Sequence, residues 1–355
     1  MKAMSNETAT GPRFISRAEA QPPFFVGVDL GGTNTKIGVV DDLGRPLAAV
    51  VIPTQPEKGP EDAVRRMGEA IRSVVAQAKL DMSEIARVGL GSPGTMDIPK
   101  GMLLKPVNLV GWDNFPIRDR LSYHCGGLPV AFINDAAAAA YGEYWVGGGR
   151  GFHSLVLLTL GTGIGCGIII GDLSIDGENS HGAECGHIII NPADDARWCN
   201  CGQRGHLEAY ASATAVVRRT REALEANVPS SLHARLQRGE TLTPKLVAEE
   251  AEKGDPLSRQ IVFETAHYLA IGIATLIHTI DPNGVLLGGA MTFGGHGSPL
   301  GREFLERIRQ ETRRRIFPVL AERTIIDFAA LGSDAGYIGA AGVARVEHRR
   351  LTGQQ

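Results

Sequence analysis

Several features that would indicate other classes of protein are missing from this sequence of 355 residues. Apolar runs stay short of the ~18 residues that a membrane-spanning helix needs, and the longest candidate, residues 268–280, contains a histidine. The first 23 residues hold no apolar core of the kind found in signal peptides. A net charge of −3 gives no reason to expect binding to nucleic acid or to a membrane. These absences predict a cytoplasmic protein.

Cysteine is also scarce, because the chain has five cysteines and three of them lie within residues 182–208. An odd number of thiols concentrated in one segment is typical of a metal site in a reducing compartment rather than of a disulfide framework. The cysteines never stand in a C-x-x-C pair, so the spacing is not that of a zinc finger.

Two familiar phosphate-binding motifs are absent as well. The sequence contains no Gly-Lys dipeptide, which excludes a Walker A loop. In residues 161–167 glycine stands at every second position, and Cys166 occupies the place of the third glycine of a dinucleotide-binding fingerprint. A Rossmann-type cofactor site is therefore not expected.

What the sequence does contain is typical of a soluble globular protein of two domains, with 43% apolar residues and a mean hydropathy close to zero. Residues 1–23 are polar and interrupted by four residues of proline or glycine, which predicts a disordered extension. Strands are expected at residues 24–30, 36–40, 47–52, 87–91, 128–133, 155–160, 166–170, 284–287 and 324–328. Helices are expected at residues 60–79, 136–140, 209–226, 243–253, 257–280, 302–315 and 335–349.

The order of elements near the N-terminus returns about 130 residues later. Residues 24–41 give a strand, a glycine- and threonine-rich turn, a second strand and an acidic turn, and residues 155–172 give the same order. This predicts a duplicated fold, although two unrelated hairpins can also look alike.

Glycine-rich loops follow three of the predicted strands, at Gly31-Gly32-Thr33, Gly161-Thr162-Gly163 and Gly288-Gly289. Glycine lets backbone N–H groups approach an anion closely, and threonine adds a hydroxyl donor. Each loop alone can be a plain hairpin, but the three together favour a nucleotide polyphosphate. Asp29 beside the first loop would then act through a divalent cation.

Asn134-Asp135 ends one predicted strand and opens the alanine-rich helix. An aspartate in this place can accept the proton of a hydroxyl that attacks a γ-phosphate. Its structural alternative is an N-cap of the helix. We interpret Asp135 as the catalytic base.

A third cluster of polar residues lies in residues 182–208. His187, Cys199, Cys201 and His206 supply four zinc-type ligands on one short loop. The alternative is a set of small buried thiols without a metal. Glu184 and Glu208 stand on either side of the cluster, and a loop that holds two carboxylates rigidly suits a polar ligand.

Taken together, these motifs resemble the ROK family (repressors, open reading frames, kinases) and its bacterial glucokinases. The resemblance covers about residues 24–345 and is carried by residues 29–34, 91–94, 134–135, 160–165, 182–187 and 199–208. It departs from the family pattern at His206, where the family's metal loop has a third cysteine; histidine is also a competent zinc ligand.

The resemblance implies an α/β protein with a two-lobed actin-like ATPase fold of the ribonuclease H-like type, each lobe a mixed sheet with flanking helices. The lobes would span residues 24–134, completed by a helix at 335–350, and residues 135–334. The nucleotide-binding residues would be Asp29, Gly31, Gly32, Thr33, Asn34, Lys36, Gly161, Thr162, Gly163, Gly288 and Gly289. Sugar would bind to Gly94, Asn108, Asn134, Asp135, Glu184, His187 and Glu208.

The expected activity is ATP-dependent phosphorylation of glucose at O6, with Mg²⁺ and a structural zinc. Kinases for N-acetylglucosamine, N-acetylmannosamine, mannose or fructose share these residues, and some relatives use polyphosphate as donor. A sugar-sensing repressor would need an N-terminal helix-turn-helix, whereas only about 23 residues, broken by proline, precede the first strand. Family members are commonly dimers or tetramers, so a homo-oligomer is expected.

Overall fold

The computed structural model describes residues 14–106 and 109–353. The chain divides into two compact units, one of residues 1–147 with 333–355 and one of residues 148–332. The sequence predicts a boundary after Asn134, but the structure has it after Gly147. The reason is that helix α3 (Asp135–Trp145) packs against α11 (Ala335–Thr352) within the first unit.

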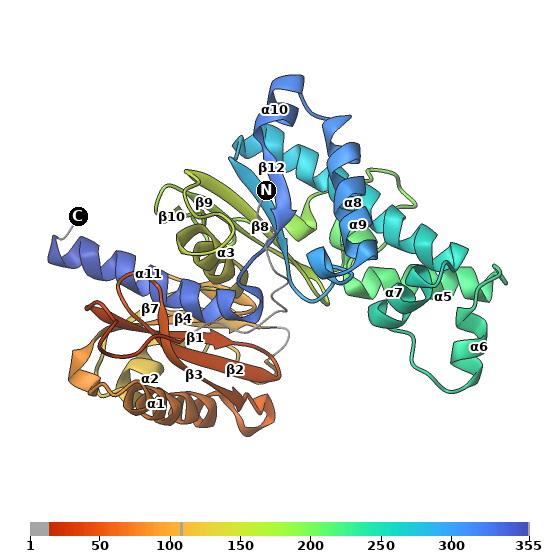
Figure 1. Ribbon diagram of the computed structural model, residues 1–355. Helices are drawn as coiled ribbons and strands as arrows, with labels where there is room; N and C mark the ends of the chain where they lie inside the picture. The colour runs from red at the N-terminus through yellow and green to blue at the C-terminus, as the bar shows by residue number, and fades with distance from the viewer. Residues whose placement is uncertain (1–13, 107–108, 354–355) are drawn as a thin grey trace. The chain divides into compact units, whose positions relative to one another are not determined.

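The described part of the first unit contains a five-stranded sheet in the order β3–β2–β1–β4–β7 (Figure 1). Strands β1 (Phe24–Leu30), β2 (Asn34–Val40) and β3 (Pro46–Pro53) pair antiparallel. Strands β4 (Ile85–Ser92) and β7 (Val130–Asn134) run parallel to β1. The three parallel strands are apolar over most of their length because they are buried on both faces.

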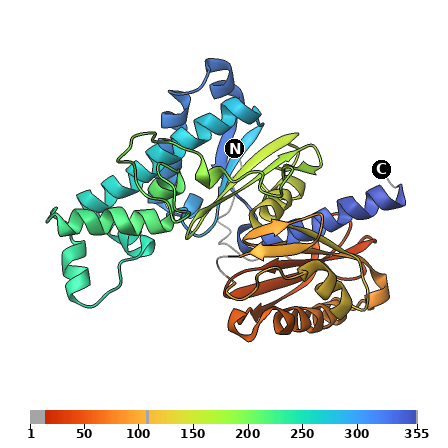
Figure 2. The same ribbon diagram turned by 180° about the vertical axis from the view of Figure 1, so that it is seen from behind.

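Helices cover both faces of this sheet. Helices α1 (Pro60–Gln77) and α2 (Ile117–His124) lie on one face, and α3 and α11 lie on the other (Figure 2). The apolar positions that predict α1 by their spacing are buried, including Val64, Ile71 and Val74. A short hairpin of β5 (Thr95–Asp97) and β6 (Met102–Lys105) follows β4 and was not expected from the sequence.

Small residues allow α11 to lie directly on the sheet and on α3. A Cβ atom at Gly27 would be 1.7 Å from the carbonyl oxygen of Tyr337, and one at Gly339 would be 1.6 Å from that of Ala138. The alanine run of α3 therefore forms a close helix–helix contact as well as a strong helix.

The second unit repeats the strand pairing of the first. Its described sheet has the order β10–β9–β8–β11–β12, with β9 (Ile164–Ile170) antiparallel to both β8 (Ser154–Leu160) and β10 (Leu173–Ser174). Strands β11 (Gly284–Gly288) and β12 (Ile325–Phe328) are parallel to β8. The predicted duplication is thus confirmed by topology.

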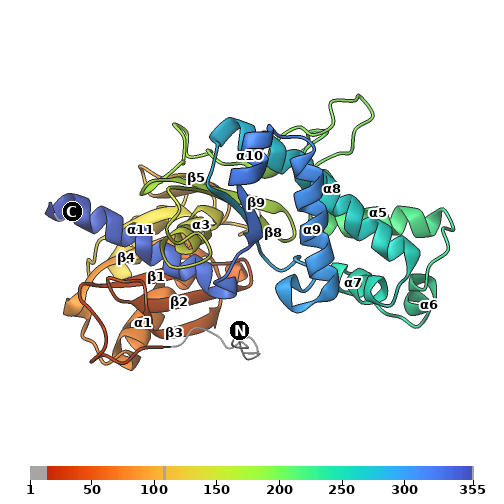
Figure 3. The ribbon, with the colours of Figure 1, turned by 45° about the horizontal axis from the view of Figure 1, so that its top comes forward.

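Helices make up most of the rest of this unit (Figure 3). They are α4 (Glu208–Ala211), α5 (Ala213–Glu225), α6 (Leu232–Gln237), α7 (Pro244–Glu252), α8 (Pro256–Ile280), α9 (Pro299–Arg313) and α10 (Pro318–Arg323). The single helix predicted at residues 209–226 is divided at Ser212, whose hydroxyl accepts a hydrogen bond from Ala215 N and caps α5. Helix α8 is long and apolar enough to cross a membrane, but 61% of its most apolar window is buried, as in a core helix.

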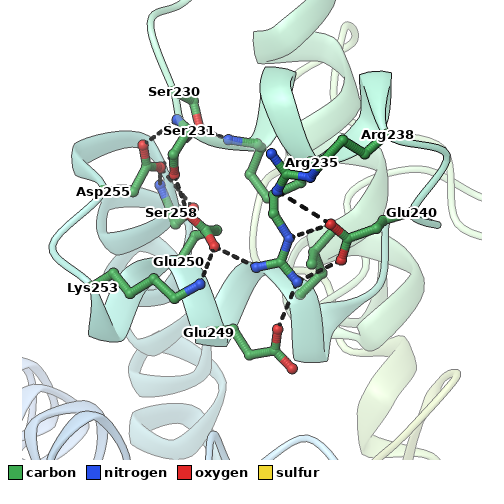
Figure 4. Close-up of polar contacts among 12 residues, drawn as sticks. Ser230, Ser231, Arg235, Arg238, Glu240, Glu249, Glu250, Lys253, Asp255 and Ser258 are labelled. Atoms are coloured by element: carbon green, nitrogen blue, oxygen red, sulfur yellow. Dashed lines mark hydrogen bonds and ion pairs between the residues drawn. The ribbon is translucent and has the colours of Figure 1, made fainter.

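Charged side chains join α6, α7 and the start of α8 (Figure 4). The guanidinium group of Arg235 lies 2.6 Å from a carboxylate oxygen of Glu240, 2.6 Å from one of Glu250 and 3.0 Å from one of Glu249. Asp255 accepts hydrogen bonds from Ser258 N and Ser231 N and so links the cap of α8 to the segment before α6. These polar contacts add to the apolar packing of Leu232, Val247 and Leu257, which belong to the core of the unit.

The segment before β1 differs from its expected disorder. In its described part, residues 14–23, Ile15 N donates to Pro46 O over 2.9 Å, and Gln21 N donates to Asp41 Oδ2 over 3.1 Å. Arg17 forms an ion pair with Glu84. Proline and glycine content therefore misled the prediction for this part of the chain, since tertiary contacts order it.

Candidate functional site

The candidate residues of the first unit gather at one edge of its sheet. Strands β1, β4 and β7 are parallel, so their carboxyl ends meet at the same edge, with Asp29 opposite Gly91 and Ser92 opposite Asn134. The Gly31 loop, Gly94 and Asp135 each follow one of these ends. Asn108, expected to contact sugar, lies outside the described residues.

The N-cap of α3 is Asn134 and not Asp135. Asn134 Oδ1 accepts hydrogen bonds from Ala136 N (2.9 Å) and Ala137 N (3.2 Å). Asp135 is the first helical residue, and its Oδ1 accepts from Ala136 N over 2.8 Å. The N-cap position therefore belongs to Asn134, and Asp135, one residue further on, shares only the N–H of Ala136 with it.

Asp29 and Asp135 influence each other electrostatically. Burial and the charge of Asp135 raise the pKa of Asp29 to about 7, against a lowering influence from Lys36. Two carboxylates that repel each other at a largely buried position form a suitable environment for a divalent cation.

The Gly31 loop is a tight connection between β1 and β2. Gly31 N donates to Asn34 O over 3.0 Å, and Thr54 Oγ1 donates to Gly31 O over 2.7 Å. Thr33 and Asn34 are exposed at its tip. The loop thus has a fixed base and a polar tip that is accessible to a ligand.

In the second unit the two other glycine-rich loops adjoin each other. A Cβ atom at Gly289, where φ is +87°, would lie 2.4 Å from the carbonyl oxygen of Leu160. Met291 N donates to the same oxygen over 3.0 Å. Leu160 directly precedes Gly161, so the predicted second phosphate loop and the predicted adenosine loop meet at the carboxyl edge of β8 and β11.

Glu208 connects the second phosphate loop to the cysteine-rich loop. Its Oε2 accepts a hydrogen bond from Ile164 N over 2.9 Å, and its Oε1 lies 3.6 Å from Cys199 Sγ. A Cβ atom at Gly163 would lie 2.3 Å from Glu208 Oε2, so a larger residue there would force this carboxylate to move. Glu184, in contrast, is about half exposed, with Oε2 4.0 Å from His187 Nε2.

The four predicted metal ligands come together in space. The ligand atoms of His187, Cys199, Cys201 and His206 lie within 4.8 Å of one another. Cys199 Sγ is 3.7 Å from His187 Nδ1, and Cys201 Sγ is 3.2 Å from His206 Nδ1. Sulfur and nitrogen ligands of a tetrahedral zinc stand about 3.6 Å apart, so the donor set fits the ion.

The surroundings of these ligands favour a bound cation. Burial raises the pKa of the Cys199 thiol to about 12, so the thiolate form needs a positive charge beside it. Burial and the neighbouring His187 lower the pKa of His206, which keeps its imidazole neutral as a ligand must be. His187 turns Nδ1 to the cluster and Nε2 away from it, so a single ring can serve both a metal and a second ligand.

The chain is similar to known proteins over nearly its whole length. A model of the ROK family matches residues 25–347. The chain belongs to the ROK family. Among its relatives, the glucokinase of Thermotoga maritima is 35% identical over 319 residues, which are 90% of this chain and 96% of that protein. A more distant relative, the xylose repressor of Caldicellulosiruptor bescii, is 29% identical and matches 82% of this chain and 71% of its own length.

Solved structures of ROK proteins agree. The ROK hexokinase from Thermus thermophilus has a TM-score of 0.79 at 32% identity and covers 92% of this chain and 99% of its own. A ROK glucokinase from Streptomyces griseus, solved with glucose and AMPPNP, has a TM-score of 0.72 at 35% identity and covers 91% and 99%. This ROK chain is a sugar kinase with the two-lobed actin-like ATPase fold.

Two polar residues near these motifs were missed by sequence reasoning. Ser333 and Asp334 lie at the start of α11 and contact Lys36. The only sequence signal was a polar pair just before a helix, which is also the signal of an ordinary cap.

Proposed function

We propose that this ROK protein transfers the γ-phosphoryl group of MgATP to O6 of glucose. The proposal is supported by the glucokinase relatives, which match nearly all of the chain, and by the polar groups at the carboxyl edge of each sheet. Kinases for N-acetylated sugars or fructose have the same chemistry, and the substrate panel described below distinguishes them.

Asp135 is the base in this proposal. The observation that carries it is the division of labour at the start of α3, where Asn134 caps the helix and Asp135 follows at the sheet edge. A carboxylate there accepts the proton of the attacking hydroxyl as the new P–O bond forms. Asn134 uses its Oδ1 to cap the helix, and its Nδ2 would donate a hydrogen bond to a sugar hydroxyl.

The nucleotide is assigned to the glycine-rich loops. Backbone N–H groups of the Gly31, Gly161 and Gly288 loops would bind phosphate and adenosine, as expected from the resemblance. Mg²⁺, when bound, neutralises phosphate charge; Asp29 would hold it directly or through water.

We assign zinc to His187, Cys199, Cys201 and His206, and sugar hydroxyls to Gly94, Glu184, His187 and Glu208. The zinc would stiffen the loop that carries His187. Glu208 already bonds Ile164 N, so one carboxylate would orient both the sugar and the second phosphate loop. We also propose a cytoplasmic homo-oligomer.

The test is release of ADP from MgATP with glucose, mannose, fructose, N-acetylglucosamine and N-acetylmannosamine. Glucose should give the highest kcat/KM. A higher value for an N-acetylated sugar would retain the base and change the substrate. Absence of turnover with every sugar, while sugar still binds, would contradict an ATP-dependent kinase, and polyphosphate would then be tried as donor.

A further inference from the structure

Lys36 occupies a central place in the first unit. It is the cross-strand partner of Asp29 in the β1–β2 pair. Its Nζ lies 2.6 Å from Asp334 Oδ1 and 3.1 Å from Ser333 Oγ. The side chain is 21% exposed, so the ammonium group stands at the boundary between the protein and solvent.

The first turn of α11 contacts both Lys36 and its cross-strand partner Asp29. Asp334 is buried, and the ring of Tyr337 lies 5.5 Å from Lys36 Nζ. A Cβ atom at Gly336 would be 2.3 Å from Asp29 Oδ2, so the helix backbone lies against the Asp29 carboxylate. The start of α11 therefore lies against Asp29 and Lys36, the two residues that stand on either side of the Gly31 loop in the chain.

A purely structural role for Asp334 is a helix cap. Asp334 has the N-cap position of α11, but its side chain makes no cap hydrogen bond to the described helix, and its backbone is helical rather than extended. The carboxylate is thus directed to Lys36 instead of to the helix N–H groups.

An ammonium group has three N–H donors. Ser333 Oγ accepts from one, Asp334 Oδ1 lies against the ammonium group as its ion-pair partner without a directed hydrogen bond, and no third acceptor contacts Lys36 Nζ within residues 14–106 and 109–353. We propose that Asp334, assisted by Ser333, is a positioning residue that fixes Lys36 so that its third N–H donates to a phosphate oxygen of the nucleotide at the Gly31 loop. This inference rests on the proposed ATP site and adds to it a residue of α11.

The experiment measures binding of the magnesium complexes of ADP and AMPPNP to the full-length protein by calorimetry. Lys36→Met should weaken both about tenfold, as expected for one charge-assisted hydrogen bond. Asp334→Asn should weaken both by about three- to tenfold. In the Lys36→Met background, Asp334→Asn should change affinity less than twofold, because the group that it positions is gone.

Asp42→Asn is the matched control. Asp42 also ties α11 to the sheet, through Arg345 and Arg349 at 2.8 Å each, but at the opposite end of the helix. It should leave nucleotide affinity within twofold. An equal loss with Asp42→Asn, or additive losses in the double variant, would show that Asp334 only holds the helix and would overturn the proposal.

Two further results keep the outcomes distinct. Ser333→Ala removes the hydroxyl acceptor and leaves the ion pair in place, and it should weaken nucleotide binding about threefold. This variant replaces Asp334→Asn if the latter does not fold. Unchanged affinity of Ser333→Ala would count against the proposal. Normal binding by both wild type and Asp334→Asn would overturn this inference alone. Failure of the wild type to bind either nucleotide would overturn the proposed function together with it.

Discussion

Replacing Asp29 by asparagine should stabilise the nucleotide-free protein at high pH. The pKa of Asp29 is raised from 3.8 to about 7, first by burial and second by the charge of Asp135. A raised pKa means that the native state binds the proton more tightly than the unfolded state. The contribution of Asp29 to the free energy of unfolding is therefore complete below pH ~4 and is lost as the pH rises through about 7.

The magnitude follows from the shift of about three pKa units at about 1.4 kcal/mol each, which sets an upper limit near 4 kcal/mol. The variant and the wild type should be equally stable at pH 4 apart from small packing effects. At pH 8 the variant should be more stable by about 2–4 kcal/mol, yet inactive with MgATP.

Chemical denaturation at pH 4.5, 6, 7 and 8, without nucleotide or magnesium, measures this difference. Asp97→Asn is a suitable control, because a hydrogen bond with Lys100 lowers the pKa of Asp97, so loss of this carboxylate should give no gain at high pH. A stability difference between Asp29→Asn and wild type that does not grow with pH would refute the reasoning.

Three other predictions concern the base, the metal loop and the packing of α11. Asp135→Asn should lower kcat by at least 10²-fold while glucose binding, followed by fluorescence, stays within a few-fold; unchanged kcat would exclude the base role. Cys199→Ser should reduce zinc in elemental analysis from about one ion per chain and weaken glucose binding; wild-type protein without zinc would disprove the assignment. Gly89→Ala places a Cβ 1.8 Å from the carbonyl oxygen of Ala340 and should destabilise by about 3 kcal/mol or more in urea denaturation, whereas Gly126→Ala, with no atom within 4 Å of its Cβ, should cost less despite its positive φ.

Much of the fold could be predicted because its signals are local. Apolar runs ending in glycine gave β1, β8 and β11, and the spacing of apolar residues gave α1. The motif positions also followed, because parallel strands bring their ends to one edge. The sequence had no comparable signal for α10 or for β5 and β6, which are short and depend on contacts with the rest of the unit.

The parts of the site that escaped prediction depend on residues far apart in the chain. Lys36 and Asp334 are separated by 298 positions, and no spacing rule connects them. Glu208 could be recognised as a polar neighbour of the metal loop, but its hydrogen bond to Ile164 N is a tertiary contact. The capping role of Asn134 was hidden for another reason: Asn and Asp are equally good caps, so the sequence alone could not assign it.

The return of the chain to the first unit sets an order for its biosynthesis. Residues 148–332 are continuous and can complete their sheet and helices as soon as they leave the ribosome. The first unit cannot, because the face of β1 and β4 that carries Gly27 and Gly89 is covered by α11, which is made last. In a nascent chain the second unit should therefore fold while the sheet of the first unit is still uncovered on one face. A protein truncated before residue 333 should keep that apolar face exposed and should aggregate.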